Sequence, residues 1–238
     1  MAMTIAIVLA AGMGNRFGDV RPKQFFIIND RPIISYTLEN LEKCCDIDAV
    51  EIVCRSEYLN ELKEIKQKYG FKKIRWFVEG GETFQYSFIN GINYLVDNSL
   101  CEYDDIIQMH LAANPTMTDD VIRDSIRVCK QFGNAFAGEP DRYPLCISND
   151  GVTGTRTLNS EGPIFRLDPP WSFKAGEIYE LYKRAKEDGI LNKLEPRTPS
   201  VFSAYGLTMH FSKYPVNNIK ITTKDDAMLF KALLDSNL

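Results

Sequence analysis

Short β-branched apolar runs alternate along this chain with longer stretches in which apolar residues recur at helical spacing. In the stretch 33–43, for example, Ile34, Leu38 and Leu41 fall on one face of a helix. Buried strands are predicted at residues 5–9, 49–54, 74–78, 106–109 and 135–137. Helices are predicted at 33–43, 57–69, 83–96 and 121–132. Strands that alternate with helices through short turns predict an α/β fold with a doubly wound, mostly parallel sheet.

From residue 139 onward the pattern changes. Residues 141–147 and 152–158 flank Asn149-Asp150-Gly151, and Asp-Gly between β-prone runs predicts a hairpin. Few apolar residues alternate in it, so we expect it to stay outside the main sheet. An isolated hairpin is marginal in water and needs a surface to pack on, either a second subunit or its own domain. The remaining predicted elements are a helix at 174–188, strands at 207–211 and 218–222, and a helix at 224–234.

The bulk composition bounds the class of protein. The chain has 238 residues, of which 45% are hydrophobic and 25% charged, and this fits one globular domain over residues 1–238 with an arm at 139–162. A net charge of −4 argues against nucleic acid or an anionic membrane as the main partner. No apolar run approaches the roughly 18–20 residues that span a bilayer, and we recognise no secretory signal at the N-terminus.

Cysteine and histidine usage narrows the chemistry further. The six cysteines show no paired Cys-x-x-Cys spacing, which predicts free thiols in a reducing cytoplasm. The two histidines, His110 and His210, lie far apart in the chain and argue against a metal site built on histidine.

The end of the first strand carries the strongest chemical signal. The run 5–9 changes abruptly to Ala10-Ala11-Gly12-Met13-Gly14, followed by Arg16 and Lys23. Glycines let a ligand approach the backbone closely, and N–H groups clustered in a turn form a concavity for an anion. Two cations beside such a concavity suit a polyphosphate. The stretch therefore predicts a nucleotide-phosphate site, although a glycine turn with two solvated cations is the alternative.

Two familiar glycine motifs do not match this stretch. A dinucleotide fingerprint needs Gly-x-Gly-x-x-Gly, but Phe17 occupies the third glycine position, and no Gly-Lys-Ser/Thr follows as a P-loop requires. Two later strands also end in small residues, at Gly80-Gly81 and at 112–114. Because ligands bind at the carboxyl ends of parallel strands, we expect these three segments on one rim of the sheet.

The complete first motif resembles that of a known enzyme family. Leu9-Ala10-Ala11-Gly12-x-Gly14-x-Arg16, followed by Pro22-Lys23-Gln24, resembles the signature of sugar-nucleotide pyrophosphorylases and, more narrowly, of methylerythritol-phosphate and ribitol-phosphate cytidylyltransferases. Gly80-Gly81-Glu82 with Ser87 resembles the family's cytosine-reading segment, and residues 218–222 resemble its C-terminal Asn-Ile-Lys-Val-Thr motif. The likeness covers most of the chain and implies a Rossmann-like nucleotidyltransferase fold that forms a homodimer through its arm.

The resemblance also implies a reaction. CMP would pass from CTP to a small polyol or sugar phosphate, with release of pyrophosphate and with Mg²⁺ bridging the triphosphate. Arg16, Lys23 and Lys220 are implied as the cations that stabilise the transition state, and a phosphate nucleophile needs no general base. The nucleotide-binding residues implied by the resemblance are Ala10, Ala11, Gly12, Gly14, Gly81, Glu82, Ser87 and Ala112.

Around the acceptor the sequence departs from the family pattern. Residues 110–115 stand for the family's His-Asp-Ala-Ala/Val-Arg-Pro, so Leu111 and Asn114 replace its carboxylate and its arginine. Ser160 replaces an arm arginine and Asp168 a threonine, which disfavours an anionic group beside Asp168 and suits a hydroxyl or amine. Further departures are Asn217, in place of an aspartate, and residues 196–199, in place of Thr-Asp-Glu-Ala.

The acceptor site is therefore expected to be specific to this chain. Arginines of the second half that could replace the missing cation are Arg142, Arg156, Arg166 and Arg197. The residues favoured for acceptor binding are Arg142, Arg166, Asp168 and Asn114. These departures favour a ribitol-phosphate-like acceptor over methylerythritol phosphate. Two alternatives stay open: a nucleotide-binding relative with lost or reduced catalysis, and a pyrophosphorylase that uses another nucleotide such as UTP.

Overall fold

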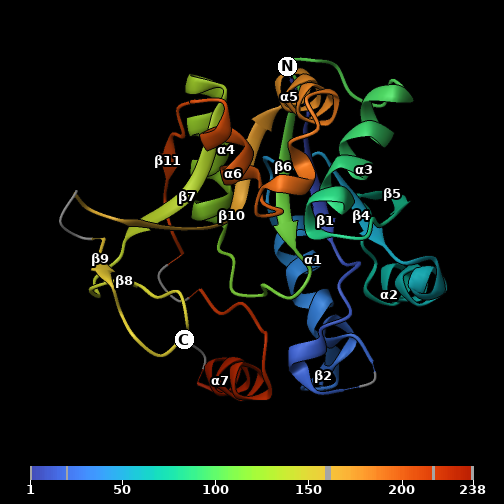
Figure 1. The fold of residues 1–238 in the computed structure, drawn as a ribbon. Helices are drawn as coiled ribbons and strands as arrows, with labels where there is room; N and C mark the ends of the chain where they lie inside the picture. The colour runs from blue at the N-terminus through green and yellow to red at the C-terminus, as the bar shows by residue number, and fades with distance from the viewer. Residues whose placement is uncertain (1, 20, 159–161, 216–217, 237–238) are drawn as a thin grey trace.

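A central seven-stranded sheet organises the computed structural model of the chain, which describes residues 2–19, 21–158, 162–215 and 218–236 (Figure 1). The strand order is β11-β7-β10-β6-β1-β4-β5. The strands are β1 (Thr4–Leu9), β4 (Ala49–Cys54), β5 (Ile74–Glu79), β6 (Ile106–Leu111), β7 (Asn134–Pro140), β10 (Phe165–Lys174) and β11 (Phe211–Ser212). Only β10 runs against the others in this sheet, because it pairs antiparallel with both β6 and β7. The doubly wound, mostly parallel sheet predicted from the sequence is confirmed.

Helices cover both faces of the sheet. They are α1 (Ile33–Lys43), α2 (Leu59–Tyr69), α3 (Phe84–Asp97), α4 (Asp119–Phe132), α5 (Ala175–Glu187), α6 (Thr198–Ala204) and α7 (Lys224–Asp235). Alternate residues of β1 point to opposite faces, so Ala6 and Val8 pack with α1, α2 and α4. Ile5 and Ile7 pack with α3, α5 and α6 instead. Because both faces are covered, β1 is an unbroken apolar run and not an alternating one.

Short elements complete the chain. They are β2 (Ile27–Ile28), β3 (Arg31–Pro32), β8 (Cys146–Ile147), β9 (Arg156–Thr157) and the 3₁₀ turns η1 (Asn15–Phe17), η2 (Lys23–Phe25), η3 (Ser56–Tyr58) and η5 (Leu191–Lys193). The turn η3 occupies the start of the helix predicted at 57–69, which begins at Leu59. No helix among the described residues is long and apolar enough to cross a bilayer.

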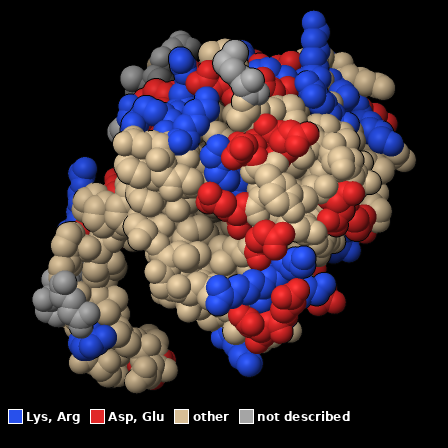
Figure 2. Space-filling view, turned by 90° about the horizontal axis from the view of Figure 1, so that it is seen from above, with Lys and Arg blue, Asp and Glu red and all other residues tan. Residues whose placement is uncertain are grey.

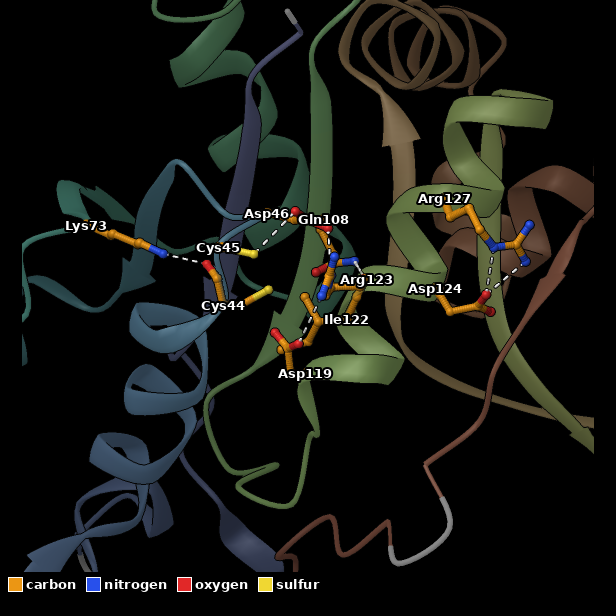
Figure 3. A network of polar contacts seen from close by, with 10 residues as sticks. All are labelled: Cys44, Cys45, Asp46, Lys73, Gln108, Asp119, Ile122, Arg123, Asp124 and Arg127. Atoms are coloured by element: carbon orange, nitrogen blue, oxygen red, sulfur yellow. Dashed lines mark hydrogen bonds and ion pairs between the residues drawn. The ribbon is translucent and has the colours of Figure 1, made fainter.

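Polar contacts tie α4 to the loop after α1 (Figure 3). Arg123 Nε lies 2.9 Å from Asp46 Oδ2, and Gln108 Nε2 of β6 donates to the Ile122 carbonyl at 3.1 Å. Lys73 Nζ donates to the carbonyl of Cys44 at 2.5 Å.

Burial raises the pKa of the Cys44 thiol to about 12, so this cysteine is an inert part of the core. The six cysteines are free thiols, as predicted.

Two predicted strands are wrong. The stretch 207–211 contributes only Phe211 to β11, which pairs with two residues at the sheet edge. Residues 218–222 form no strand; the Ile219 N–H donates to Thr116 Oγ1 and the Ile221 N–H to the Ala113 carbonyl, both at 2.9 Å. Their pattern reflects a buried Ile221 among half-buried neighbours that lie against a loop, which periodicity alone does not distinguish from a strand.

Besides the short strands and turns, two elements were not predicted, β10 and α6. The pair Pro169-Pro170 removes two ladder donors from β10, which argues against a central strand. The sheet accommodates them because the register of β10 on β7 shifts between Leu167 and Trp171. Such an irregularity re-aims side chains, and here it coincides with the position of Asp168.

The predicted hairpin stands apart from the main sheet (Figures 1 and 2), as expected, whereas residues 139–140 of the predicted arm are the end of β7. Its paired part is shorter than predicted, because β8 pairs with β9 over two residues each. The Asp150 carboxylate accepts the N–H groups of Val152 and Thr153 at 2.9 and 2.8 Å. The loop is therefore a wide turn organised around one side chain and not a two-residue Asp-Gly turn.

A buried acid lies between β4 and α3. Neither carboxyl oxygen of Glu51 has a hydrogen-bond partner among the described residues, and burial raises its pKa well above the usual range. A Cβ added to Gly91 of α3 would lie 2.7 Å from Glu51 Oε2. Glycine at that position thus lets the helix approach the strand, and the Glu51 carboxyl is held in its neutral form.

We expect Glu51→Gln to stabilise the fold increasingly as pH rises. A raised pKa means that the folded wild type loses stability between the unfolded pKa of Glu and its own higher pKa, at about 1.4 kcal/mol per pH unit. Glutamine carries no charge and escapes this loss. Urea unfolding at pH 5 and pH 8 measures it, with Glu64→Gln on the exposed face of α2 as the control. A stability difference that does not change with pH would show that Glu51 is not kept neutral.

Candidate active site

A cleft of about 800 Å³ opens where several strands of the sheet end. Its walls include Ala11–Gly14 after β1, 55–57 after β4, 79–83 at the end of β5, and 111–113 at the end of β6. The small-residue segments expected on one rim therefore do lie together. Residues far along the chain close the other side of the cleft: Asp168, Pro169, Trp171, Glu195, Pro196, Arg197, Lys220 and Thr222.

Contacts with two buried side chains, Gln24 and Phe17, hold the glycine loop after β1 in place. Gln24 is 3% exposed, and its Nε2 donates to the Ala10 carbonyl at 2.7 Å and to the Gly12 carbonyl at 3.2 Å. Phe17, which interrupts the dinucleotide fingerprint, is buried and meets the Phe26 ring edge-on at 5.0 Å. Gly14 has φ +69°, a left-handed conformation that glycine adopts without strain. The loop is thus a preformed concavity, and Gln24 and Phe17 are the supports that sequence reasoning did not assign.

Three cations line the cleft beside this loop: Arg16, Lys23 and Lys220. Burial lowers the pKa of Lys23 to about 8, and the positive charges of Lys220 and Arg16 act in the same direction. Only Asp226, at the start of α7, opposes the shift. The cations therefore repel one another in the free protein, and a polyphosphate placed among them would relieve that repulsion.

The C-terminal segment brings Lys220 to the cleft. Ile221 is fully buried between Phe17 of the glycine loop and Phe230 of α7, and its N–H is bonded to Ala113 after β6. Because Ile221 points into this cluster, its neighbour Lys220 lines the cleft.

Lys220 faces an acid across the cleft wall. Its Nζ lies 3.9 Å from Asp168 Oδ1, and Asp168 Oδ2 accepts the Asn218 amide at 2.9 Å. Burial raises the pKa of Asp168 and lowers that of Lys220, each toward its neutral form. At this separation burial outweighs the attraction between the two groups. The pair is therefore a loose one that a phosphate could displace.

Close packing and Ser87 hold the loop after β5, where the base-reading residues are predicted. A Cβ added to Gly81 would lie 2.5 Å from Tyr86 Cβ, so the loop packs too closely for any other residue. Ser87 Oγ accepts the Gly81 N–H at 3.0 Å and donates to the Thr83 carbonyl at 2.9 Å. Ser87 thus holds the loop in place. Direct reading of cytosine by Gly81, Glu82 and Ser87, all of which line the cleft, stays a prediction.

The structure sorts the remaining predicted residues. Ala11, Gly12, Gly14 and Ala112 line the cleft, whereas Ala10 lies beneath the loop with its N–H bonded to the Val53 carbonyl at 2.7 Å. Of the residues favoured for the acceptor, Asp168 lines the cleft and Asn114, Arg142 and Arg166 do not.

These three residues lie in other parts of the molecule. Asn114 is buried, at 2% exposed, and neither polar atom of its side-chain amide has a hydrogen-bond partner among the described residues. Arg166 lies 3.4 Å from Asp141 and 4.0 Å from Glu139, so it belongs to the base of the arm. Arg142 is exposed on the arm itself. Two positions at which the sequence departs from the family, Ser160 and Asn217, lie outside the described residues.

Sequence reasoning missed the charged pairs at the cleft wall. Arg55 Nε lies 3.1 Å from Glu57, and Arg197 Nε lies 2.7 Å from Glu195. The first pair directly follows a predicted strand, which was an available signal. The second precedes α6, a helix that was not predicted, so nothing in the sequence placed it on the rim.

Neither acid–base chemistry by histidine nor a protein-held metal finds support here. His110 is fully buried on β6, where its Nε2 lies 2.8 Å from Gln108 Oε1, and burial lowers its pKa to about 3. The described part of the chain contains no group of three or more His, Cys, Asp or Glu side chains placed to hold a metal ion. The cleft instead combines the glycine loop with cations and with carboxylates such as Asp168 and Glu195.

Comparison with known proteins agrees with this geometry. The family model for 2-C-methyl-D-erythritol 4-phosphate cytidylyltransferase matches residues 4–236. The chain belongs to this family. It is therefore a nucleotidyltransferase of the CTP-dependent cytidylyltransferase type.

Relatives of this cytidylyltransferase carry two names. It is 33% identical over 232 residues to a ribitol-5-phosphate cytidylyltransferase of Lacticaseibacillus paracasei, with 98% of each chain covered. It is 31% identical over 238 residues to a 2-C-methyl-D-erythritol 4-phosphate cytidylyltransferase of Clostridium novyi, covering 99% of this chain and 98% of the relative. A crystal structure of a 4-diphosphocytidyl-2C-methyl-D-erythritol synthase superposes with a TM-score of 0.80 at 20% identity, covering 99% of this chain and all of the other. That structure supports the fold of the cytidylyltransferase.

We expect Lys23→Ala and Arg16→Ala each to lower turnover by about 100-fold or more, because each removes a preplaced charge from the transition state. Pyrophosphate release from CTP with a polyol phosphate acceptor measures the effect. Lys63→Ala, on the exposed face of α2, is the matched control and should retain wild-type turnover. Near-normal turnover in a folded Lys23 or Arg16 variant would remove that residue from the site.

Proposed function

We propose that the chain transfers CMP from CTP to ribitol 5-phosphate, releasing pyrophosphate and forming a CDP-linked polyol. The observation that carries the proposal is the convergence of Arg16, Lys23 and Lys220, from distant segments, on one cleft with the glycine loop. The relatives named for ribitol 5-phosphate, including that of L. paracasei, support this choice of acceptor.

The cations would do the chemical work. A phosphate oxygen of the acceptor attacks the α-phosphorus of CTP, a new P–O bond forms, and the bond from the α-phosphorus to the bridging oxygen breaks. Negative charge accumulates on the departing pyrophosphate, where Lys23 and Arg16 would stabilise it. Lys220 would neutralise the approaching acceptor phosphate, and Asp168, released from Lys220, would accept hydrogen bonds from the acceptor's hydroxyls. A phosphate dianion is already a nucleophile, so the buried His110 is not needed as a base.

Magnesium is proposed as an ion that CTP carries and not as an ion held by the protein. Asp168 and Glu195, two carboxylates at the cleft wall, already face Lys220 and Arg197. Mg²⁺ commonly binds substrate phosphates while keeping several waters. Among the residues that the structure describes, no group of three or more His, Cys, Asp or Glu side chains is placed to hold Mg²⁺.

The acceptor side favours a hydroxyl-rich ligand. Leu111 lines the cleft at the end of β6 and provides no hydrogen-bonding group, whereas Asp168 offers acceptors for hydroxyl hydrogens. A linear polyol phosphate presents such hydroxyls along its whole length. Methylerythritol phosphate carries a methyl branch and one hydroxyl fewer, so it would satisfy this wall less well.

A homodimer in the cytoplasm is proposed as the working form. Tyr143 and Val152 of the arm are 71% and 88% exposed, and a second copy of the chain would cover them. The six free thiols suit a reducing compartment. Light scattering that finds only monomer at assay concentration would contradict the dimer.

We expect kcat/KM for ribitol 5-phosphate to exceed that for methylerythritol phosphate by about tenfold or more, since an unpaired buried polar group costs about 1–3 kcal/mol. For the same reason CTP should be preferred to UTP by about 100-fold or more. Pyrophosphate release over a panel of acceptors measures both preferences, and Lys23→Ala protein provides the blank.

Other outcomes would favour the alternatives. Binding of CTP without release with any acceptor would indicate a relative that has lost catalysis. Equal rates with UTP and CTP would indicate a pyrophosphorylase of broader base specificity. Faster turnover of methylerythritol phosphate would overturn the assignment of the acceptor.

A further inference from the structure

One arginine of the second half lines the cleft. Of the four candidates Arg142, Arg156, Arg166 and Arg197, the described cleft wall includes Arg197 alone. It belongs to the segment Glu195-Pro196-Arg197, which lines the cleft together with Asp168 and Lys220.

The charge of Arg197 acts on both of these neighbours. Its positive charge lowers the pKa of Asp168 and of Lys220, although burial is the larger influence on each. Arg197 and Lys220 are therefore two cations beside the same carboxylate, in the part of the cleft to which the proposed function assigns the acceptor phosphate. Lys220 carries a point charge, whereas a guanidinium can grip a phosphate with two parallel hydrogen bonds.

The backbone of Arg197 is fixed while its side chain is not. Arg197 is the residue before α6, and its carbonyl accepts the Ser200 N–H at 3.1 Å. The next residue, Thr198, is fully buried, with its Oγ1 2.8 Å from the hydroxyl of Tyr182 on α5. The Arg197 side chain itself is 52% exposed and rests on Glu195 at 2.7 Å. An exposed ion pair of this kind is weak, so a ligand can separate it at little cost.

We propose that Arg197 binds the acceptor phosphate from the same chain that provides the glycine loop, and that Glu195 is its resting counter-ion. The inference rests on the proposed function. Arriving phosphate displaces Glu195 from Arg197 and Asp168 from Lys220, so two loose ion pairs become one phosphate held by two cations. Arg197 would then supply, from the same chain, a cation in place of the family arginine that Asn114 replaces.

The test distinguishes an effect on acceptor binding from an effect on nucleotide binding. Arg197→Ala should raise KM for ribitol 5-phosphate roughly tenfold to a hundredfold, as expected for lost charge-assisted hydrogen bonds, and leave KM for CTP within about twofold. The KM of Arg197→Lys for ribitol 5-phosphate should lie between those of the wild type and Arg197→Ala, since lysine keeps the charge but cannot donate two parallel hydrogen bonds. The control is Arg127→Ala, which removes another paired, exposed arginine, on α4 (Figure 3), and should match the wild type.

Glu195→Gln gives the sharper readout, because it should change KM in the opposite direction. Without its counter-ion Arg197 is free for phosphate, so KM for ribitol 5-phosphate should fall about twofold to fivefold. A purely structural pair would make both variants worse together. Equal effects of Arg197→Ala on both substrates, or none on either, would overturn the inference.

Failure of the proposed function would be seen separately, in the wild type. If another phosphorylated acceptor is turned over, the same variants are compared with that acceptor. If none is turned over, calorimetric titration of ribitol 5-phosphate into CTP-loaded protein replaces KM. Binding that Arg197→Ala weakens tenfold supports the inference, and binding that is absent or unchanged contradicts it.

Discussion

Mutual repulsion among Lys23, Lys220 and Arg16 is the constraint on which the cleft depends. Like charges gather at one place only if the fold holds them there, and each of them has a clear support. Gln24 binds the carbonyls of the glycine loop, and Phe17 anchors that loop in a small core beneath it. Ile221 enters the same core and carries Lys220 to the cleft. Burial, and after it the charges of Lys220 and Arg16, lowers the pKa of Lys23, and a bound triphosphate would raise this pKa again.

In the part of the cleft proposed for the acceptor, attraction within ion pairs replaces repulsion among cations. Here the cations have counter-ions, Asp168 for Lys220 and Glu195 for Arg197, and both pairs are loose. A cleft that binds the triphosphate mainly through Arg16 and Lys23, and the acceptor through exchangeable ion pairs, would bind the two substrates by different means. That difference is why variants of the two regions should separate in their effects on the two substrates.

Much of the fold could be predicted because its signals are local. The apolar run of β1, the helical spacing in α1 and the glycine transition at residue 12 each depend on a few neighbouring residues. The wrong and missing elements depend on distant ones. Residues 218–222 alternate like a strand but lie against the loop after β6, and β10 contains two prolines that the sheet tolerates only through a shift in register. Motifs identified the glycine loop and the three cations of the cleft. Arg197 was only one of four candidate arginines in the sequence, and it lines the cleft as the residue before α6, a helix that was not predicted.

The most direct test of the account is the proton balance of CTP binding at pH 8. With a pKa of about 8, Lys23 is half protonated in the free protein, while the triphosphate is fully ionised. If the triphosphate relieves the repulsion, the pKa of Lys23 rises and binding takes up about half a proton. Calorimetry in buffers of different ionisation enthalpy measures this uptake, and Lys23→Ala should abolish it. Binding by the wild type with no proton uptake, or the same uptake in the variant, would contradict the account.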